Sequence, residues 1–227
     1  SALLMRKRLL ALGLLLAVSF SASGGRLQRR CDQFFPPQLR ELPFDALTNA
    51  NTSAWIADNL GFRGTRTWGD PASGQAWIWS DGLGRKIFQT LRPPYGLYPT
   101  DPPLAKLLID YLQSEQPTVD DVVRCLSAPE YYEARNAPPS VRIFSMLYPS
   151  KGIALEATYS WSGPPFPVTG GTKLGSLSLM RPGTLTEMAR GLYEGFDFRD
   201  DGEVIEFGMR PWPQKLSDIA PTPNNPR

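Results

Sequence analysis

The chain has 227 residues, of which 41% are hydrophobic and 20% charged, and its formal net charge is +2. This is the composition of an ordinary globular protein, and the near balance of charge excludes the electrostatic footprint of a nucleic-acid-binding protein. The 23 prolines and 20 glycines predict many turns and short elements instead of long helices.

The first 25 residues have the three parts of an export signal. A basic cluster at 6–8 precedes an apolar run at 9–20, and small residues follow at 21–25. Export machinery reads this arrangement, and the apolar run is shorter than the roughly 20 residues that a membrane span needs. We expect 1–25 to be a cleaved signal peptide, with Met5 as the true start, and the rest to be periplasmic, cell-surface or secreted. The alternative is a chain tethered to the membrane by an uncleaved signal.

The two cysteines, Cys31 and Cys125, matter because of this signal. Outside the cytoplasm thiols tend to pair. A bridge between these two cysteines would close a long loop, and in the chain-entropy model it would stabilise the folded chain by about 4 kcal/mol. The alternative is two unrelated cysteines, one exposed and one buried on a helix. Basic residues directly before Cys31 are unlike the apolar stretch that precedes a lipid-modified cysteine, so we expect no lipid anchor there.

After the signal, residues 26–45 are expected to form an irregular strap that docks without regular structure. A first α+β unit, 46–92, follows. Its predicted helix ends near Leu60, because Trp55, Ile56 and Leu60 lie at helical spacing and Gly61 follows. Alternation in 75–80, a turn at 81–84 and a partner strand at 85–91 predict a β-hairpin.

A proline-rich connector, 93–103, leads to a second α+β unit, 104–212, and a flexible tail, 213–227. The apolar residues of 104–112 lie at helical intervals and predict a helix. Thr118 is expected to cap a second helix with acids in its first turn. The remaining predictions are strands at 141–148, 152–161, 174–180 and 203–209, and a helix at 185–192. The fold class expected is therefore α+β, with short helices packed on antiparallel sheet, in two tandem helix-then-hairpin units.

The segment Thr118-Val119-Asp120-Asp121-Val122-Val123-Arg124-Cys125-Leu126-Ser127-Ala128-Pro129, with paired strands after it, resembles the helix-then-hairpin core of the SmpA/OmlA (BamE-like) envelope proteins. The resemblance covers about 118–159. Ser127 stands where that family prefers glycine. The resemblance implies an envelope scaffold or protein-binding module instead of an enzyme, with the open face of the sheet as the contact surface.

No catalytic, metal-binding or cofactor-binding residue is predicted. The chain has no histidine, which removes the Ser-His-Asp and Cys-His mechanisms and the usual zinc ligand sets. The densest acidic cluster does not have the spacing of an EF-hand loop, and we interpret Asp200-Asp201-Gly202 as a hairpin turn. The cluster consists of Asp197, Asp200, Asp201, Glu203 and Glu206.

The six tryptophans are the remaining candidates for binding. Trp68, Trp77 and Trp79 could form an exposed platform for a sugar or a protein, or they could form core. We therefore expect a non-catalytic exported module that binds a protein partner at the envelope or outside the cell. The alternative is a carbohydrate or cell-wall binding module that uses the three tryptophans, and a glycosidase acting through carboxylates is a third hypothesis.

Overall fold

The computed structural model describes residues 25, 28–48, 51–61, 65–68, 75–80, 86–91, 104–137, 141–160, 168–193 and 196–219. The predicted signal peptide and connector lie outside these ranges, apart from Gly25. Within them, no helix is long and apolar enough to cross a membrane. The helices are α2 (Pro37–Arg40), α3 (Thr52–Leu60), α4 (Val119–Leu126), α5 (Leu185–Leu192) and α6 (Asp201–Phe207), with 3-10 turns η2 (Pro149–Lys151) and η3 (Leu216–Asp218).

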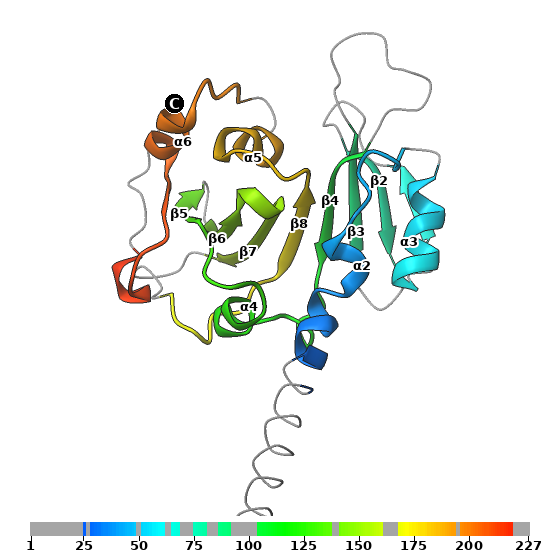
Figure 1. Ribbon diagram of the computed structural model, residues 1–227, viewed down its shortest axis with the longest axis horizontal. Helices are drawn as coiled ribbons and strands as arrows, with labels where there is room; N and C mark the ends of the chain where they lie inside the picture. Colours follow the sequence, from blue (N-terminus) through cyan, green and yellow to red (C-terminus); the bar gives the residue numbers. More distant parts are fainter. Residues whose placement is uncertain are drawn as a thin grey trace, which may run out of the picture.

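The described strands form one antiparallel sheet (Figure 1). Its order is β1-β2-β3-β4-β8-β7-β6-β5-β9, so β4 and β8 join the two halves of the chain. The fold is therefore α+β, as predicted. The strands are β1 (Thr65–Trp68), β2 (Gln75–Ser80), β3 (Lys86–Leu91), β4 (Leu104–Asp110), β5 (Tyr131–Ala137), β6 (Val141–Tyr148), β7 (Ile153–Ser160), β8 (Ser176–Met180) and β9 (Met209–Pro211).

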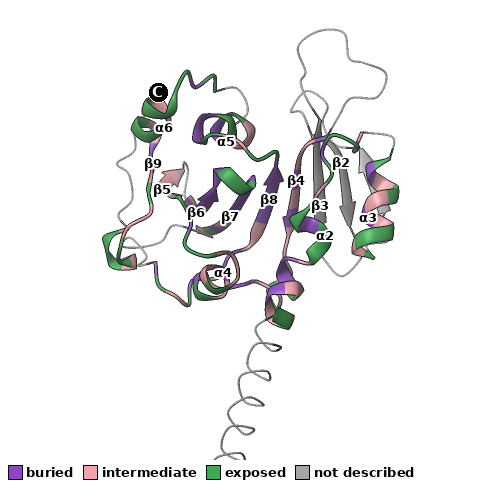
Figure 2. Cartoon of the chain, viewed as in Figure 1, coloured by how far each residue is buried: buried purple, intermediate pink, exposed green. Residues whose placement is uncertain are grey.

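The sheet has a first face that carries the main core. Met146, Leu155, Leu177 and Ile109 are paired in one row across β6, β7, β8 and β4. Helix α3 packs on this face through Ile56. Helix α4 packs on it through Val119 and Val122, which have no exposed surface. Figure 2 shows β8, near the middle of the sheet, as a mostly buried strand.

The second face carries a smaller core beneath α5 and α6. Leu147 of β6, Ala154 of β7 and Met180 of β8 form one buried cluster with Met188 of α5 and Val204 of α6. Figure 1 shows α5 and α6 beside one end of the strands β5 to β8, at the top of the view. The remainder of this face is richer in polar side chains.

Local sequence signals explain the helices that were predicted correctly. Thr118 and Thr184 each accept a hydrogen bond from the third residue of their helix, and Asp121 and Glu187 bond back to the cap, which completes two capping boxes. Gly61 ends α3 in the left-handed conformation with a φ of 62°. The hairpin of β2 with β3 is also confirmed, although its turn lies outside the described residues.

Three predictions of secondary structure were wrong. Residues 104–110 form β4, a strand paired on both sides, because apolar residues on both faces of an interior strand mimic helical spacing. Residues 203–207 lie in α6 instead of a strand, and Asp200 is its N-cap instead of a turn residue. The strap is not irregular, because residues 28–34 and α2 are helical. Strand β5 was not predicted at all.

The predicted tail is described as far as residue 219. Leu216 and Ile219 pack against the main core there, with Trp212 just before them. The ring of Trp212 lies 6.3 Å from the ring of Tyr132, edge to face. This part of the tail therefore covers the first face near β5.

Candidate functional site

A disulfide joins Cys31 to Cys125, and their Cα atoms are 5.6 Å apart. Of the two interpretations of the cysteines, the structure supports the bridge. It ties the helical segment 28–34 to α4 across a sequence separation of 94. Cys31 is buried, with 6% of its surface exposed.

Two further contacts hold the same N-terminal segment. A guanidinium nitrogen of Arg30 lies 3.0 Å from Oδ2 of Asp121 in α4. The Tyr111 hydroxyl donates to the carbonyl of Phe34 at 2.6 Å. Burial acts to raise the pKa of Asp121, but the hydrogen bonds from Arg30 and Thr118 outweigh it, so that pKa lies below its ordinary value. The ionised Asp121 therefore both caps α4 and anchors the segment.

On the second face, a polar row crosses five strands. The ladder pairs Glu133 of β5 with Ser145, Ser145 with Glu156 of β7, Glu156 with Ser176, and Ser176 with Asp110 of β4. Directly paired positions share one face of a sheet. This row continues the face that α5 and α6 cover at its other end.

The centre of the candidate site is the cluster of Glu133, Arg135 and Tyr193. Glu133 has no exposed surface, and its Oε1 lies 2.7 Å from Nε of Arg135. The Tyr193 hydroxyl, just after α5, donates to Oε2 of Glu133. The Arg135 guanidinium lies 5.1 Å from the centre of the Tyr193 ring, in cation–π geometry. Oε2 of Glu133 therefore accepts a hydrogen bond from Tyr193, whereas Oε1 lies in the ion pair with Arg135 and has no hydrogen-bond partner among the described residues.

Burial raises the pKa of Glu133 above its ordinary value of 4.5, with the charge of Arg135 and the bond from Tyr193 acting in the opposite direction. Burial likewise raises the pKa of Glu156, which accepts a hydrogen bond from Thr158 at 2.9 Å. The charge of Arg135 also lowers the pKa of Glu156, and Asp110 raises it. The second face thus holds interacting carboxyl groups that are costly to ionise.

Three further aromatic rings, those of Phe196, Phe198 and Phe207, pack beside Tyr193 or against one another. Tyr193 contacts Phe207 with ring centres 5.0 Å apart, and Phe196 stacks on Phe198 at 5.8 Å. Phe196 also lies 5.2 Å from Phe207. Phe198 is buried, whereas 48% of Phe196 is exposed. The rings therefore form an aromatic group next to Tyr193 in which Phe198 is buried and Phe196 is partly exposed to solvent.

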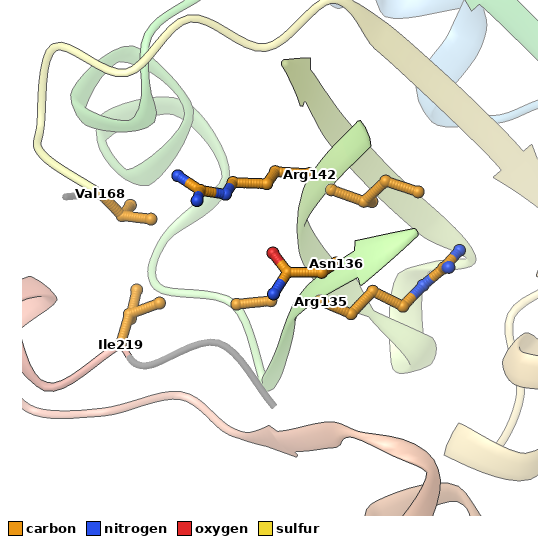
Figure 3. Close-up of a pocket in the computed structure, with 7 residues that line it drawn as sticks. Arg135, Asn136, Arg142, Val168 and Ile219 are labelled. Atoms are coloured by element: carbon orange, nitrogen blue, oxygen red, sulfur yellow. The ribbon is translucent and has the colours of Figure 1, made fainter. Parts of the chain in front are cut away.

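On the first face, a small hollow lies between β5, β6 and the chain near Ile219 (Figure 3). Figure 3 shows Arg142 directed toward Val168, while Arg135 is directed away from the hollow. Its volume of about 10 Å³ suits one water molecule. The Oδ1 atom of Asn136 is buried there without a hydrogen-bond partner among the described residues. The hollow is too small for a substrate.

The three candidate tryptophans lie on strands β1 and β2, for which the structure describes the backbone pairing but not the side chains. Trp68 of β1 is paired with Trp77 of β2. Across β3, the row of Trp77 leads to Leu107 of β4, and the row of Trp79 leads to Ile109 of β4. Both β4 residues are buried on the first face. The register therefore places the three tryptophan positions on the same face as the main core.

The acidic cluster is part of α6 and its N-terminus. Asp200 accepts from the backbone N–H of Glu203 at 3.0 Å, Glu203 pairs with Arg199, and Oδ1 of Asp201 accepts from the Thr186 backbone at 3.0 Å. Within the described residues, no group of three or more acids and cysteines is arranged to hold a metal ion. Asp200 therefore caps α6, Asp201 links α6 to α5, and Glu203 forms an ion pair with Arg199.

The sequence did not predict the Glu133 cluster, because it depends on the pairing of β5 and on the end of α5. The signal that was present is the alternation of Glu133 and Arg135 within an aromatic segment, which places both on one face of a strand. Comparison with protein-family models, with curated proteins and with solved structures found no match for this chain.

Proposed function

We propose that the chain is a non-catalytic exported protein that acts as a protein-binding or structural module of the cell envelope or the extracellular space. The disulfide between Cys31 and Cys125 carries this proposal. Disulfide bonds form and persist in oxidising compartments. The first cysteine of this one, Cys31, lies a few residues after the predicted signal peptide. The absence of histidine from the whole chain supports a non-catalytic role.

The resemblance to the BamE-like envelope proteins is part of the same proposal. Helix α4 is followed by the antiparallel strands β5, β6 and β7, which is the order of elements in that core. Ser127 gives further support, because it adopts a φ of 72° at the position where the family prefers glycine. Glycine is the residue that adopts this conformation without strain.

Export is tested by fractionating the native host with the full chain and with a variant that carries Leu14→Arg and Leu15→Arg. The charges break the apolar run that the export machinery must recognise. We expect the natural chain outside the cytoplasm with its cysteines bonded, and the variant inside with free thiols. Equal distribution of the two chains would contradict the proposal.

The alternative function, carbohydrate or cell-wall binding, uses Trp68, Trp77 and Trp79. Their adjacent register positions on β1 and β2 favour a common role for the three. Titration with wall glycans while tryptophan fluorescence is recorded tests it, with Trp77→Ala as the variant. A spectral change that Trp77→Ala removes while the fold persists would favour glycan binding, and unfolding by Trp77→Ala would assign the residue to the core.

A further inference from the structure

The segment 196–207 combines exposed apolar side chains with a strong local charge. Among the residues whose side chains are described, Phe196 and Ile205 are the exposed large hydrophobics, at 48% and 43%. Both fall within twelve residues of each other in the sequence. We call residues 196–207 the acidic-aromatic surface.

Its charge is opposite to that of the whole chain. The segment has five acids and a single base, Arg199, so its formal net charge is −4, whereas the chain as a whole carries +2. Arg190 of α5 offsets one charge, since its Nε lies 3.6 Å from Oδ1 of Asp197. Asp197, Asp200, Asp201 and Glu206 are exposed, so the segment that carries the two hydrophobic side chains keeps a negative formal charge even when Arg190 is counted.

The surface is also held rigidly. Phe196 packs against Phe198 and Phe207, and the Arg190 side chain donates to the carbonyl of Phe198 at 2.8 Å. The Thr186 hydroxyl bonds to Asp201, which fixes the start of α6 to α5. A preorganised surface loses little entropy when a partner binds.

We propose that the acidic-aromatic surface binds a protein segment that presents lysine or arginine side chains around an apolar residue. The inference rests on the proposed function, since it names the class of partner for a binding module. Phe196 supplies the apolar contact, and the acids of α6 attract the basic side chains and set the orientation of the partner. Anionic lipid headgroups and nucleic acid would be repelled by the same acids.

The test is photo-crosslinking in the native host, with p-benzoylphenylalanine placed at position 205. Matched probes are placed at 45 and 217, which are exposed and lie outside the surface. The crosslinked peptide is sequenced, synthesised and titrated against the purified chain. We expect capture at position 205 of a segment with several basic residues and an apolar one.

In the titration, Glu206→Lys and Phe196→Ser should each weaken binding by about tenfold or more, and Asp45→Lys by less than about twofold. Asp45 is a matched control, because its side chain is 94% exposed and lies outside the segment. Thermal unfolding of Phe196→Ser checks that the domain stays folded, and Glu206→Lys tests the surface without removing a packed ring.

Capture at 45 or 217 alone would overturn this inference and leave the proposed function standing. Capture of an acidic or uncharged segment, a lipid or a glycan at 205 would also overturn the inference. Equal binding by Glu206→Lys and Asp45→Lys would do the same. Capture at none of the three positions would count against the proposed function as well.

Discussion

The hydroxyl of Tyr193 donates a hydrogen bond to Oε2 of Glu133, and this contact joins the end of α5 to the buried second face of β5. Glu133 has no exposed surface, so the hydrogen bond from Tyr193 and the ion pair with Arg135 replace the water that would otherwise stabilise its carboxylate. The contact therefore fixes α5 and the aromatic rings that follow it on the sheet.

Tyr193→Phe should lower the free energy of unfolding by about 1–3 kcal/mol, because a buried carboxylate loses its donor while the ring packing is kept. Tyr159→Phe is the matched control, since its hydroxyl makes an exposed bond of 3.3 Å to the Lys173 carbonyl. Urea unfolding of both variants measures the difference. Equal effects of the two substitutions would show that Glu133 does not depend on Tyr193.

Stability should fall as pH rises above 4.5, the ordinary pKa of glutamate. The pKa of Glu133 is raised in the folded state, so the folded chain binds more protons than the unfolded chain between the two pKa values, and unfolding becomes easier with increasing pH. Glu156 contributes with the same sign.

Glu133→Gln removes one of these titrations and should flatten the fall in stability as pH rises above 4.5. Asp121 acts in the opposite direction, because its pKa is lowered: its contribution is lost as pH falls through its folded pKa, below 3.8. Unfolding free energies measured across this range in both chains provide the check. An unchanged slope in Glu133→Gln would contradict the assignment.

Removal of the disulfide should cost about 3–5 kcal/mol, because the bond closes a loop with a sequence separation of 94. The variant is Cys31→Ser combined with Cys125→Ser, and chemical denaturation without reductant gives the loss. Arg30 and Tyr111 still hold the N-terminal segment in this variant. Addition of Arg30→Ala should therefore lower stability again, and a double variant as stable as the natural chain would be inconsistent with a structural bridge.

Ser127→Gly should raise the free energy of unfolding by about 1 kcal/mol. Ser127 has a φ of 72° and a ψ of 179°, a region that costs a non-glycine residue about 1–3 kcal/mol. The gain is reduced by the freedom that glycine adds to the unfolded chain. Ser217→Gly, at an exposed serine without positive φ, should give no increase. Thermal and urea unfolding of Ser127→Gly and Ser217→Gly measure the two changes in stability. No gain in Ser127→Gly relative to Ser217→Gly would contradict the prediction.

Much of the fold could be predicted where signals are local. The caps Thr118 and Thr184, and the turn at Gly152 with its φ of 65°, mark elements through short-range hydrogen bonds and backbone freedom. Strand β4 could not be assigned in this way, because Leu107, Leu108 and Ile109 are consecutive, which puts apolar residues on both faces of the strand and interrupts the alternation of apolar and polar residues.

The other errors have equally specific causes. Val204 and Ile205 favour a strand by propensity, whereas Asp200 and Glu203 form a cap-like pair that starts α6. The Glu133 cluster required knowledge that β5 pairs with β6 and that α5 returns over them. The contact between Tyr193 and Glu133 joins residues 60 positions apart, and no short-range pattern predicts such a contact, so the cluster could be recognised only in the structure.

The central claim is an exported domain held by a bond between Cys31 and Cys125. The most direct test is the intact mass of the protein recovered from the envelope and medium fractions of its native host, with and without reductant, after alkylation. The account predicts a species that starts near Gly25 and takes up alkyl groups only after reduction. A full-length species with two freely alkylated thiols, confined to the cytoplasm, would contradict it.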